Sequence, residues 1–213
     1  MTEVAVVDYG MGNLLSVRRG FEHCGATVTV TSDPDIILSA PRVVLPGVGA
    51  FKDGMAELCS LGLDSVVREV AARGSFLLGI CLGMQMLLDE SEEFGVTEGL
   101  GIIPGHVVPV PSTTVDGLSQ KIPHVGWNSL VLSNGIKNWD GGLLQEITLG
   151  GSAYFVHSFM AFPNNPDHCI ADCYYGGMRV SASIGRDNIY GCQFHPEKSG
   201  EVGLKVLRRF LSL

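Results

Sequence analysis

The sequence has little charge and no long apolar segment. Of its 213 residues, 14 are Lys or Arg and 22 are Asp or Glu, which gives a formal net charge of -8. Phosphate backbones select surfaces rich in Lys and Arg, so no nucleic-acid partner is expected. No segment reaches the roughly 18 uninterrupted apolar residues of a membrane span, and no basic run with a short apolar core stands at the start. We therefore expect no membrane contact and a place in the cytoplasm.

The cysteines and glycines also lack the spacing of two common cofactor sites. None of the 6 cysteines belongs to a Cys-x-x-Cys pair, and His168, Cys169 and Cys173 lack a fourth ligand, so no metal is predicted. Gly10-Met11-Gly12 resembles the start of a dinucleotide fingerprint, but Leu15 stands where the third glycine belongs. We predict no cofactor. Disulfides are not expected in a reducing compartment.

The residues that build a core are abundant. Hydrophobic residues make up 46% of the sequence, and 28 glycines fall mainly between apolar runs, where tight turns are needed. No internal repeat or low-complexity linker divides the chain. We expect residues 1–213 to form one domain.

The first half alternates strand and helix signals. Strands are predicted at Val4–Val7, Thr27–Thr31, Val43–Leu45 and Phe76–Leu78, and helices at Leu14–Cys24 and Leu63–Ala72. This alternation predicts an α/β fold with an open, mostly parallel central sheet that is covered by helices on both faces.

The second half has shorter apolar runs separated by Gly, Asn, Asp and Pro. Strands are predicted at Ala153–Val156, Ile170–Cys173, Arg179–Ile184 and Ile189–Gln193. We interpret them as antiparallel additions to the sheet. An amphipathic helix is predicted over Glu201–Leu213.

A cysteine occupies the turn between a predicted strand and a predicted helix. Phe76–Leu78 leads into Gly79-Ile80-Cys81-Leu82-Gly83, and Met84–Leu88 then begins a helix. Flanking glycines let the backbone bend sharply, so the Cys81 thiol would project from the carboxyl edge of the sheet. A helix N-terminus favours a thiolate, and its free amides can stabilise an oxyanion. The pattern predicts a nucleophile, although a buried cysteine in a glycine-rich turn has the same spelling.

A histidine and a carboxylate near the C-terminus complete a candidate triad. His195 and Glu197 are two apart in what we expect to be an extended segment, so both side chains would face the same way. Cys81 would attack as the nucleophile, and His195 would act as general base and then general acid. Glu197 would orient the imidazole and stabilise its charged form.

Six segments follow one another in the order found in a known family. They are Asp8–Leu14, Leu45–Phe51, Gly79–Gln85, Pro123–Asn128, Tyr154–Ser158 and Gln193–Ser199. With them, nearly the whole chain resembles class I, triad-type glutamine amidotransferases, and within these the glutaminase subunits of imidazole glycerol phosphate synthase. The resemblance implies the single-domain fold of that family.

The resemblance also implies a reaction and a partner. The reaction is hydrolysis of L-glutamine to glutamate and ammonia through a γ-glutamyl thioester on Cys81. The ammonia would pass to a separate (β/α)8 cyclase subunit, bound as a heterodimer, for histidine biosynthesis. A barrel takes ~250 residues, so the acceptor site is expected on another polypeptide.

Further site residues are implied by position in the motifs. The amides of Val48 and Leu82 would form the oxyanion hole, and the loop around Val48 would reorient on activation. The residues implied for glutamine binding are Gly49, Gln85, Glu93, His157 and Ser158. Glu93 would bind the α-ammonium group, although its acidic run Asp89–Glu93 also has the composition of a solvated face. Phe159 stands where the family frequently has Tyr.

Four residues are implied at the interface with the cyclase: Asn13, Trp127, Tyr154 and Lys198. Because Lys198 directly follows Glu197, docking of the partner and the geometry of the triad could be linked through very short backbone. We expect the barrel subunit to activate the glutaminase by this route.

Three other functions share many of these features. A paralogous glutaminase subunit that supplies ammonia to an enzyme of surface-sugar synthesis would have the same elbow and triad. A non-catalytic binding subunit would keep only the pocket, which the intact triad argues against. A triad hydrolase could also act on another amide, such as a γ-glutamyl peptide, although the small loops around Cys81 fit a small substrate better.

Overall fold

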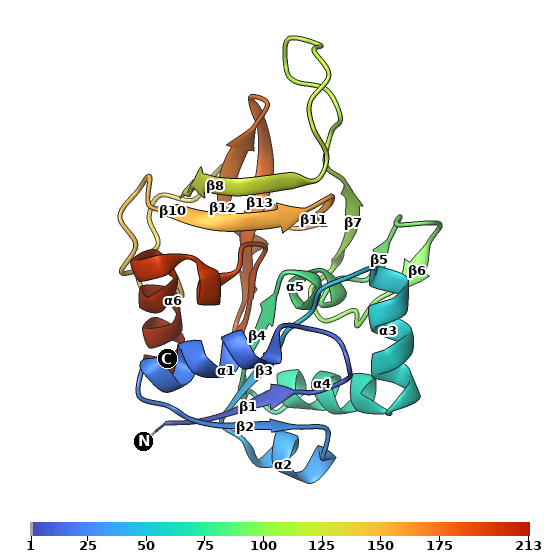
Figure 1. The fold of residues 1–213 in the computed structure, drawn as a ribbon, viewed down its shortest axis with the longest axis vertical. Helices are drawn as coiled ribbons and strands as arrows, with labels where there is room; N and C mark the ends of the chain where they lie inside the picture. Colours follow the sequence, from blue (N-terminus) through green and yellow to red (C-terminus); the bar gives the residue numbers. More distant parts are fainter. Residues whose placement is uncertain (1) are drawn as a thin grey trace.

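The computed structural model describes residues 2–213, and its largest element is a twisted sheet of eight strands (Figure 1). The strands follow the order β2-β1-β3-β4-β14-β13-β12-β9. Their bounds are β2 Thr27–Thr31, β1 Glu3–Val7, β3 Arg42–Leu45, β4 Phe76–Ile80, β14 Ile189–Cys192, β13 Met178–Arg186, β12 Cys169–Tyr175 and β9 Val131–Leu132. The α/β prediction is confirmed, and each strand expected in the first half is present within a few residues of its expected bounds.

Strand direction divides this sheet into two parts. The pairs β2–β1, β1–β3, β3–β4 and β4–β14 are parallel. The pairs β14–β13, β13–β12 and β12–β9 are antiparallel. The expectation that Ile189–Gln193 is an antiparallel addition is therefore wrong on one side: β14 joins the two parts, because it is parallel to β4 and antiparallel to β13.

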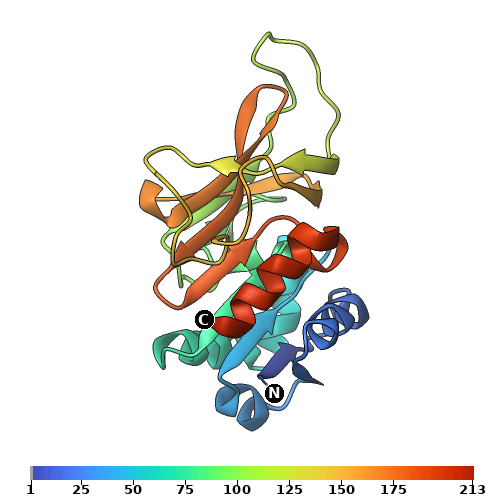
Figure 2. The same ribbon diagram turned by 90° about the vertical axis from the view of Figure 1, so that its left-hand side faces the viewer.

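Helices cover both faces of the parallel part. Helices α1 (Leu14–His23) and α6 (Gly200–Ser212) lie on one face, and Figure 2 shows α6 crossing it. Helices α2 (Pro34–Ser39), α3 (Phe51–Ser60), α4 (Leu63–Ala72) and α5 (Leu82–Met86) lie on the other. Alternate residues of β1 face opposite ways, so Val4 and Val6 pack in the first core while Ala5 and Val7 pack in the second. The doubly covered sheet explains why the central strands β1, β3 and β4 are almost continuously apolar, whereas the edge strand β2 alternates Thr and Val.

Two smaller sheets lie beyond the end of the large one. Strands β8 (His124–Ser129) and β10 (Ser152–His157) form an antiparallel pair. Strands β11 (Phe159–Pro163), β7 (Gly105–Pro109), β5 (Glu90–Ser91) and β6 (Thr97–Glu98) form the other. The predicted strand Ala153–Val156 exists as β10, but its expected pairing with the large sheet is wrong, since its partner is β8.

Two 3-10 turns complete the described structure: η1 spans Pro166–His168 and η2 spans Pro196–Lys198. The predicted C-terminal helix is confirmed as α6, whose Val206, Leu207 and Phe210 are fully buried. None of the helices in residues 2–213 has the length and apolar character needed to cross a bilayer.

Candidate active site

Cys81 lies at a strained turn between β4 and α5. It is the N-cap of α5 and has φ 54 and ψ -110, a left-handed φ that costs a residue other than glycine about 1–3 kcal/mol. A Cβ atom at Gly83 would lie 1.8 Å from the carbonyl oxygen of Leu45, and one at Gly79 would lie 2.6 Å from the oxygen of Gly83. Both glycines are therefore required by close backbone approach, and the expected strand, tight turn and helix are confirmed.

His195 and Glu197 form a buried pair just after β14. Nδ1 of His195 lies 2.8 Å from Oε1 of Glu197, and the two side chains are only 3% and 1% exposed. The expectation of an extended segment is wrong here, because Pro196 begins the turn η2 and the Lys198 amide donates to the His195 carbonyl. Proline favours the first position of such a turn, and the turn bends Glu197 back toward the imidazole.

The environment of His195 favours its charged form. Burial lowers the pKa of His195, but the interactions with Cys81 and Glu197 exceed that effect and raise the pKa to about 9. With Nδ1 bonded to the carboxylate, Nε2 is left without a hydrogen-bond partner among residues 2–213. The imidazole is thus held by one nitrogen and can exchange a proton through the other.

A cavity of about 280 Å³ opens beside these groups. It is lined by Val48, Gly49, Cys81, Leu82, Gln85, Glu93, Pro123, Val156, His157, Ser158, Phe159 and His195. All the residues expected to act in catalysis, oxyanion binding or substrate binding are in this set except Glu197, which is bonded to His195 from outside. Folding therefore brings the elbow and the histidine, distant in sequence, to one site.

The expected oxyanion residues lie on two sides of Cys81. Leu82 occupies the first position of α5, where helix geometry leaves its amide without an intrahelical acceptor. Val48 is 40% exposed in the loop that follows β3, and the next residue, Gly49, has φ +111, which only glycine adopts readily. The Tyr9 hydroxyl donates to the carbonyl of Pro46 at 2.7 Å and anchors the start of this loop.

Gln85 takes part in a side-chain network that reaches the thiol. Its Nε2 donates to Oε1 of Gln193 at 2.9 Å and to the carbonyl of Phe159 at 3.0 Å, and Gln193 Nε2 donates to the Cys81 sulfur at 3.7 Å. Gln193 is not among the residues expected from the sequence to act at this site. The available signal was its place two residues before His195 and directly after β14, which lies next to β4, the strand that precedes Cys81.

Glu93 contacts the helix that follows the Val48 loop. Its Oε2 accepts a hydrogen bond from the Phe51 amide at 2.6 Å, and the side chain also lines the cavity. Glu93 is therefore not part of a fully solvated acidic face. Its side chain is only partly exposed, whereas the neighbouring Glu92 is exposed.

His157 contributes a buried side chain as well as backbone. His157 Nδ1 bonds the carbonyl of Phe159 at 2.8 Å, and Nε2 lies 3.0 Å from Nδ1 of His124. The Phe159 carbonyl can only accept, so His157 Nε2 must accept in turn from His124 Nδ1. Burial lowers the pKa of His157 to about 4 and also lowers the pKa of His124. The pair is therefore neutral at physiological pH, with its tautomers fixed.

The four expected interface residues lie outside the cavity. Trp127 is 59% exposed, and its ring is 6.1 Å from that of Tyr154, its register partner across β8 and β10. The Tyr154 carbonyl accepts from the His195 amide at 2.9 Å, and the Tyr154 amide donates to Ser199 Oγ at 2.9 Å. Lys198 is exposed in η2, and Asn13 is half-exposed, with its Oδ1 capping α1. This face is thus hydrogen-bonded directly to the segment that carries the histidine.

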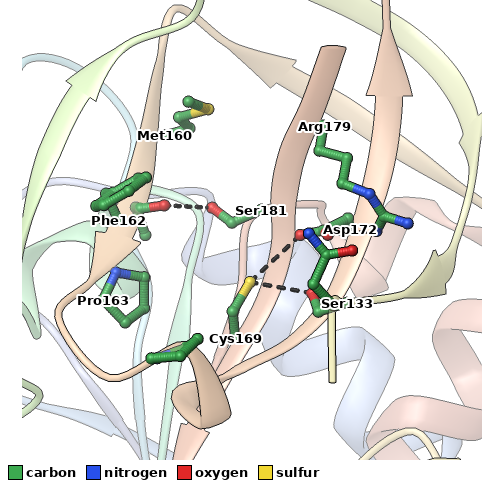
Figure 3. Close-up of a pocket in the computed structure, with 11 residues that line it drawn as sticks. Ser133, Met160, Phe162, Pro163, Cys169, Asp172, Arg179 and Ser181 are labelled. Atoms are coloured by element: carbon green, nitrogen blue, oxygen red, sulfur yellow. Dashed lines mark hydrogen bonds and ion pairs between the residues drawn. The ribbon is translucent and has the colours of Figure 1, made fainter. Parts of the chain in front are cut away.

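A second cavity, of about 260 Å³, lies between β11 and the β12–β13 pair (Figure 3). The Cys169 thiol donates to Asp172 and accepts from Ser133 Oγ. Burial and the nearby Asp172 carboxylate raise the pKa of Cys169 to about 12, so this thiol is neither a nucleophile nor a ready metal ligand. Within residues 2–213, no group of three or more His, Cys, Asp or Glu side chains could hold a metal ion.

Comparisons with known proteins place the chain among its relatives. The family description "Glutamine amidotransferase class-I" matches residues 5–212. Imidazole glycerol phosphate synthase subunit HisH 1 of Legionella pneumophila (strain Lens) is 54% identical over 213 residues, which cover 100% of both chains. Subunit HisH of the same synthase from Geobacillus sp. (strain WCH70) is 45% identical over 210 residues, which cover 99% of this chain and 96% of the relative.

Solved structures are similar in fold at much lower identity. The structure of PurLQS from Thermotoga maritima contains a chain with a TM-score of 0.70 and 18% identity, and the match covers 99% of this chain and 98% of that one. At this identity the likeness extends to the fold alone. The predicted fold class is therefore confirmed by structure as well as by sequence.

Proposed function

The chain belongs to the class-I glutamine amidotransferase family, and we propose that it is the glutaminase subunit of an imidazole glycerol phosphate synthase. In this proposal it hydrolyses L-glutamine to glutamate and ammonia, and the ammonia passes to a separate (β/α)8 cyclase subunit of histidine biosynthesis. The full-length relatives bear the name of this synthase subunit, which supports the proposal.

The observation that supports the chemistry best is the shared cavity of Cys81 and His195. A thiol at a helix N-terminus faces the same space as an imidazole held by a buried carboxylate. Nucleophile, base and orienting acid are the parts needed for acyl transfer through a covalent intermediate. A binding subunit would gain nothing from a strained elbow and a buried charged pair, both of which cost stability.

The first half of the reaction forms the thioester. The proton given up by Cys81 resides on Nε2 of His195, whose ring is charged at neutral pH, and the sulfur attacks the side-chain amide carbon of glutamine. The negative charge that develops on the carbonyl oxygen is stabilised by the amides of Leu82 and Val48. The imidazolium then protonates the leaving nitrogen, the carbon–nitrogen bond breaks, and ammonia departs. A pKa of about 9 suits His195 to the donor role, because the ring stays charged at neutral pH.

The second half releases glutamate. Neutral His195 takes a proton from water, the hydroxide attacks the thioester, and the carbon–sulfur bond breaks as the thiolate leaves. Glu197 keeps the imidazole in one orientation in both halves, since its Oε1 holds Nδ1 throughout. The Gln85–Gln193 network would fix the amide end of the substrate next to the sulfur, and Glu93 would bind its α-ammonium group.

The exposed aromatic face supports the partner part of the proposal. Trp127 and Tyr154 form a T-shaped pair at the surface, and large aromatic side chains are common anchors of protein interfaces. Because the Tyr154 backbone is bonded to the His195 amide and to Ser199, a displacement of β10 on docking would reach the triad. We therefore expect the cyclase to activate glutamine hydrolysis.

Two measurements test the function. Glutamate release by the complex should fall by at least about 1,000-fold in Cys81→Ala, as expected for loss of a catalytic nucleophile; full activity in this variant would refute the nucleophile. Affinity purification from the native organism should recover a (β/α)8 cyclase. Recovery of a surface-sugar enzyme instead would favour the paralogue, and faster cleavage of γ-glutamyl peptides than of glutamine would favour a different amide hydrolase.

A further inference from the structure

Helix α3 begins without a cap from its own sequence. Its N-cap residue is Ala50, which has no side-chain acceptor for the free amides of the first turn. The first of these amides, that of Phe51, donates instead to Oε2 of Glu93 at 2.6 Å. Glu93 comes from the turn between β5 and β6, far along the chain. A carboxylate at this place also interacts favourably with the helix dipole.

The same hydrogen bond holds one end of the oxyanion loop, which is the segment Gly47–Ala50 that carries the Val48 amide. The loop Gly47–Ala50 lies between two anchors, the Tyr9–Pro46 hydrogen bond before it and the Glu93–Phe51 hydrogen bond after it. Within residues 2–213, the peptide groups of Gly47, Val48 and Gly49 make no hydrogen bonds of their own. The direction of the Val48 amide therefore depends on how firmly the two ends are held.

Glu93 also has an oxygen available to the substrate. Its Oε1 makes no hydrogen bond with residues 2–213, and the side chain lines the cavity next to Val48 and Gly49. A carboxylate can accept several hydrogen bonds, so Oε1 can take a charged donor while Oε2 keeps the Phe51 amide.

We propose that Glu93 is a positioning residue for the oxyanion loop, in addition to its role as the ligand of the substrate's α-ammonium group. Oε2 fixes the start of α3 and thereby the end of the loop that carries the Val48 amide. An α-ammonium group bound at Oε1 fixes the carboxylate itself, so that a substrate with the correct amino end also orders the oxyanion hole. This inference rests on the glutaminase function proposed above and specifies how the site selects α-amino amides.

The kinetic test separates charge from hydrogen bonding at Glu93. Glu93→Gln removes the charge but keeps an oxygen for the Phe51 amide, so in the complex KM for glutamine should rise about 10-fold or more while kcat stays within about 2-fold. Glu93→Ala removes both, so KM should rise similarly and kcat should also fall about 10-fold to 100-fold. The control is Glu92→Ala, which deletes an exposed carboxylate in the same turn and should change neither constant.

A second variant tests whether the kcat defect comes from the start of α3. Ala50→Ser supplies a local cap. Combined with Glu93→Ala, it should restore a substantial part of kcat and none of the KM. Equal kcat values for Glu93→Ala and Glu93→Gln would overturn the positioning role, and so would an Ala50→Ser double variant with no recovery.

A readout without substrate keeps this inference separate from the function itself. In the full chain, the Phe51 amide should exchange with solvent at least about 10-fold faster in Glu93→Ala than in Glu92→Ala, and nearly normally in Glu93→Gln. If the wild-type complex released no glutamate, the proposed function would be wrong. The exchange experiment would still show whether Glu93 holds the Phe51 amide. Unchanged exchange in Glu93→Ala would overturn the anchor even in an active enzyme.

Discussion

The two halves of the molecule solve the problem of placing a catalytic group in different ways. The parallel half holds Cys81 at the end of β4, with helices on both faces and backbone packed against backbone at Gly83. The antiparallel half holds His195 between β14 and the short turn η2, which packs against α6 and β10. The proposed nucleophile is thus fixed by the sheet itself, whereas the proposed base is fixed by a turn and its neighbours. We therefore expect the backbone around Cys81 to be rigid and the backbone around His195 to be able to shift.

The largest effect is expected from a methyl group added at the turn between β4 and α5. In Gly83→Ala the new Cβ would lie 1.8 Å from the Leu45 carbonyl oxygen, and β3 is held between β1 and β4. We expect a loss of more than about 4 kcal/mol in the free energy of unfolding, or no folded protein. Urea unfolding measures it, and Gly142→Ala is the control, since its Cβ would meet nothing closer than 3.5 Å. A mild effect in Gly83→Ala would mean that β3 can move.

On the other side, the carboxylate that orients the base is the most informative target. Glu197→Gln keeps the shape but removes the charge that helps raise the pKa of His195, so kcat/KM should fall about 100-fold or more. The alkaline limb of the pH profile should lie near 9 in the wild type, where His195 loses the proton that it gives to ammonia, and at lower pH in the variant. An unchanged limb would show that another group controls it.

A methyl group beside η2 tests directly whether the backbone around His195 can shift. In Gly203→Ala the Cβ would lie 1.8 Å from the Pro196 carbonyl oxygen, as close as in Gly83→Ala, but the neighbour is a 3-10 turn. We expect the turn to shift, with about 1–3 kcal/mol lost in stability and about 10-fold lost in kcat/KM. If Gly203→Ala were as damaging to folding as Gly83→Ala, the contrast between the halves would be wrong.

The smallest expected effect concerns the buried histidine pair. The pKa of His157 in the folded protein, about 4, lies below the 6.5 of an unfolded histidine, so the unfolded chain binds more protons as the pH falls. Stability should decline from pH 6.5 toward pH 4, with His157 contributing about 1–3 kcal/mol of that decline. His157→Gln should reduce the decline, while replacement of the exposed His23 by Gln should not. Urea unfolding at pH 7.5 and pH 5 measures both.

The same contrast explains which features the sequence could predict. In the parallel half, the strands are short β-branched or apolar runs that alternate with helical spacing, so Thr27–Thr31 was predicted to the residue and a helix was expected near Leu63 to Ala72, where α4 lies. In the second half, β10, β12, β13 and β14 were predicted, but β7, β8 and β11 were missed and the pairing partners were not identified. The pairing of β10 with β8 and of β14 with β4 depends on contacts between distant segments, to which periodicity is blind.

The site shows a similar limit. The elbow was predictable because its glycines and its cysteine are consecutive, and the His195–Glu197 pair because two side chains stand close in sequence. The Gln85–Gln193 bond and the Glu93–Phe51 bond join separate elements, and each residue alone has an ordinary polar side chain. The local conformation of Glu197 was also mispredicted, since Pro196 suits both an extended strand and the first position of a turn.

The two tryptophans of the chain differ sharply in environment, and this has a practical use. Trp139 is 6% exposed and its indole nitrogen donates to the Ile170 carbonyl, whereas Trp127 stands at the surface beside Tyr154. Indole fluorescence shifts to the blue when water leaves its surroundings, so a Trp139→Phe protein would contain a single tryptophan, on the face that we propose binds the cyclase. The fluorescence of Trp127 would report association with the cyclase in real time, without a label and independently of turnover.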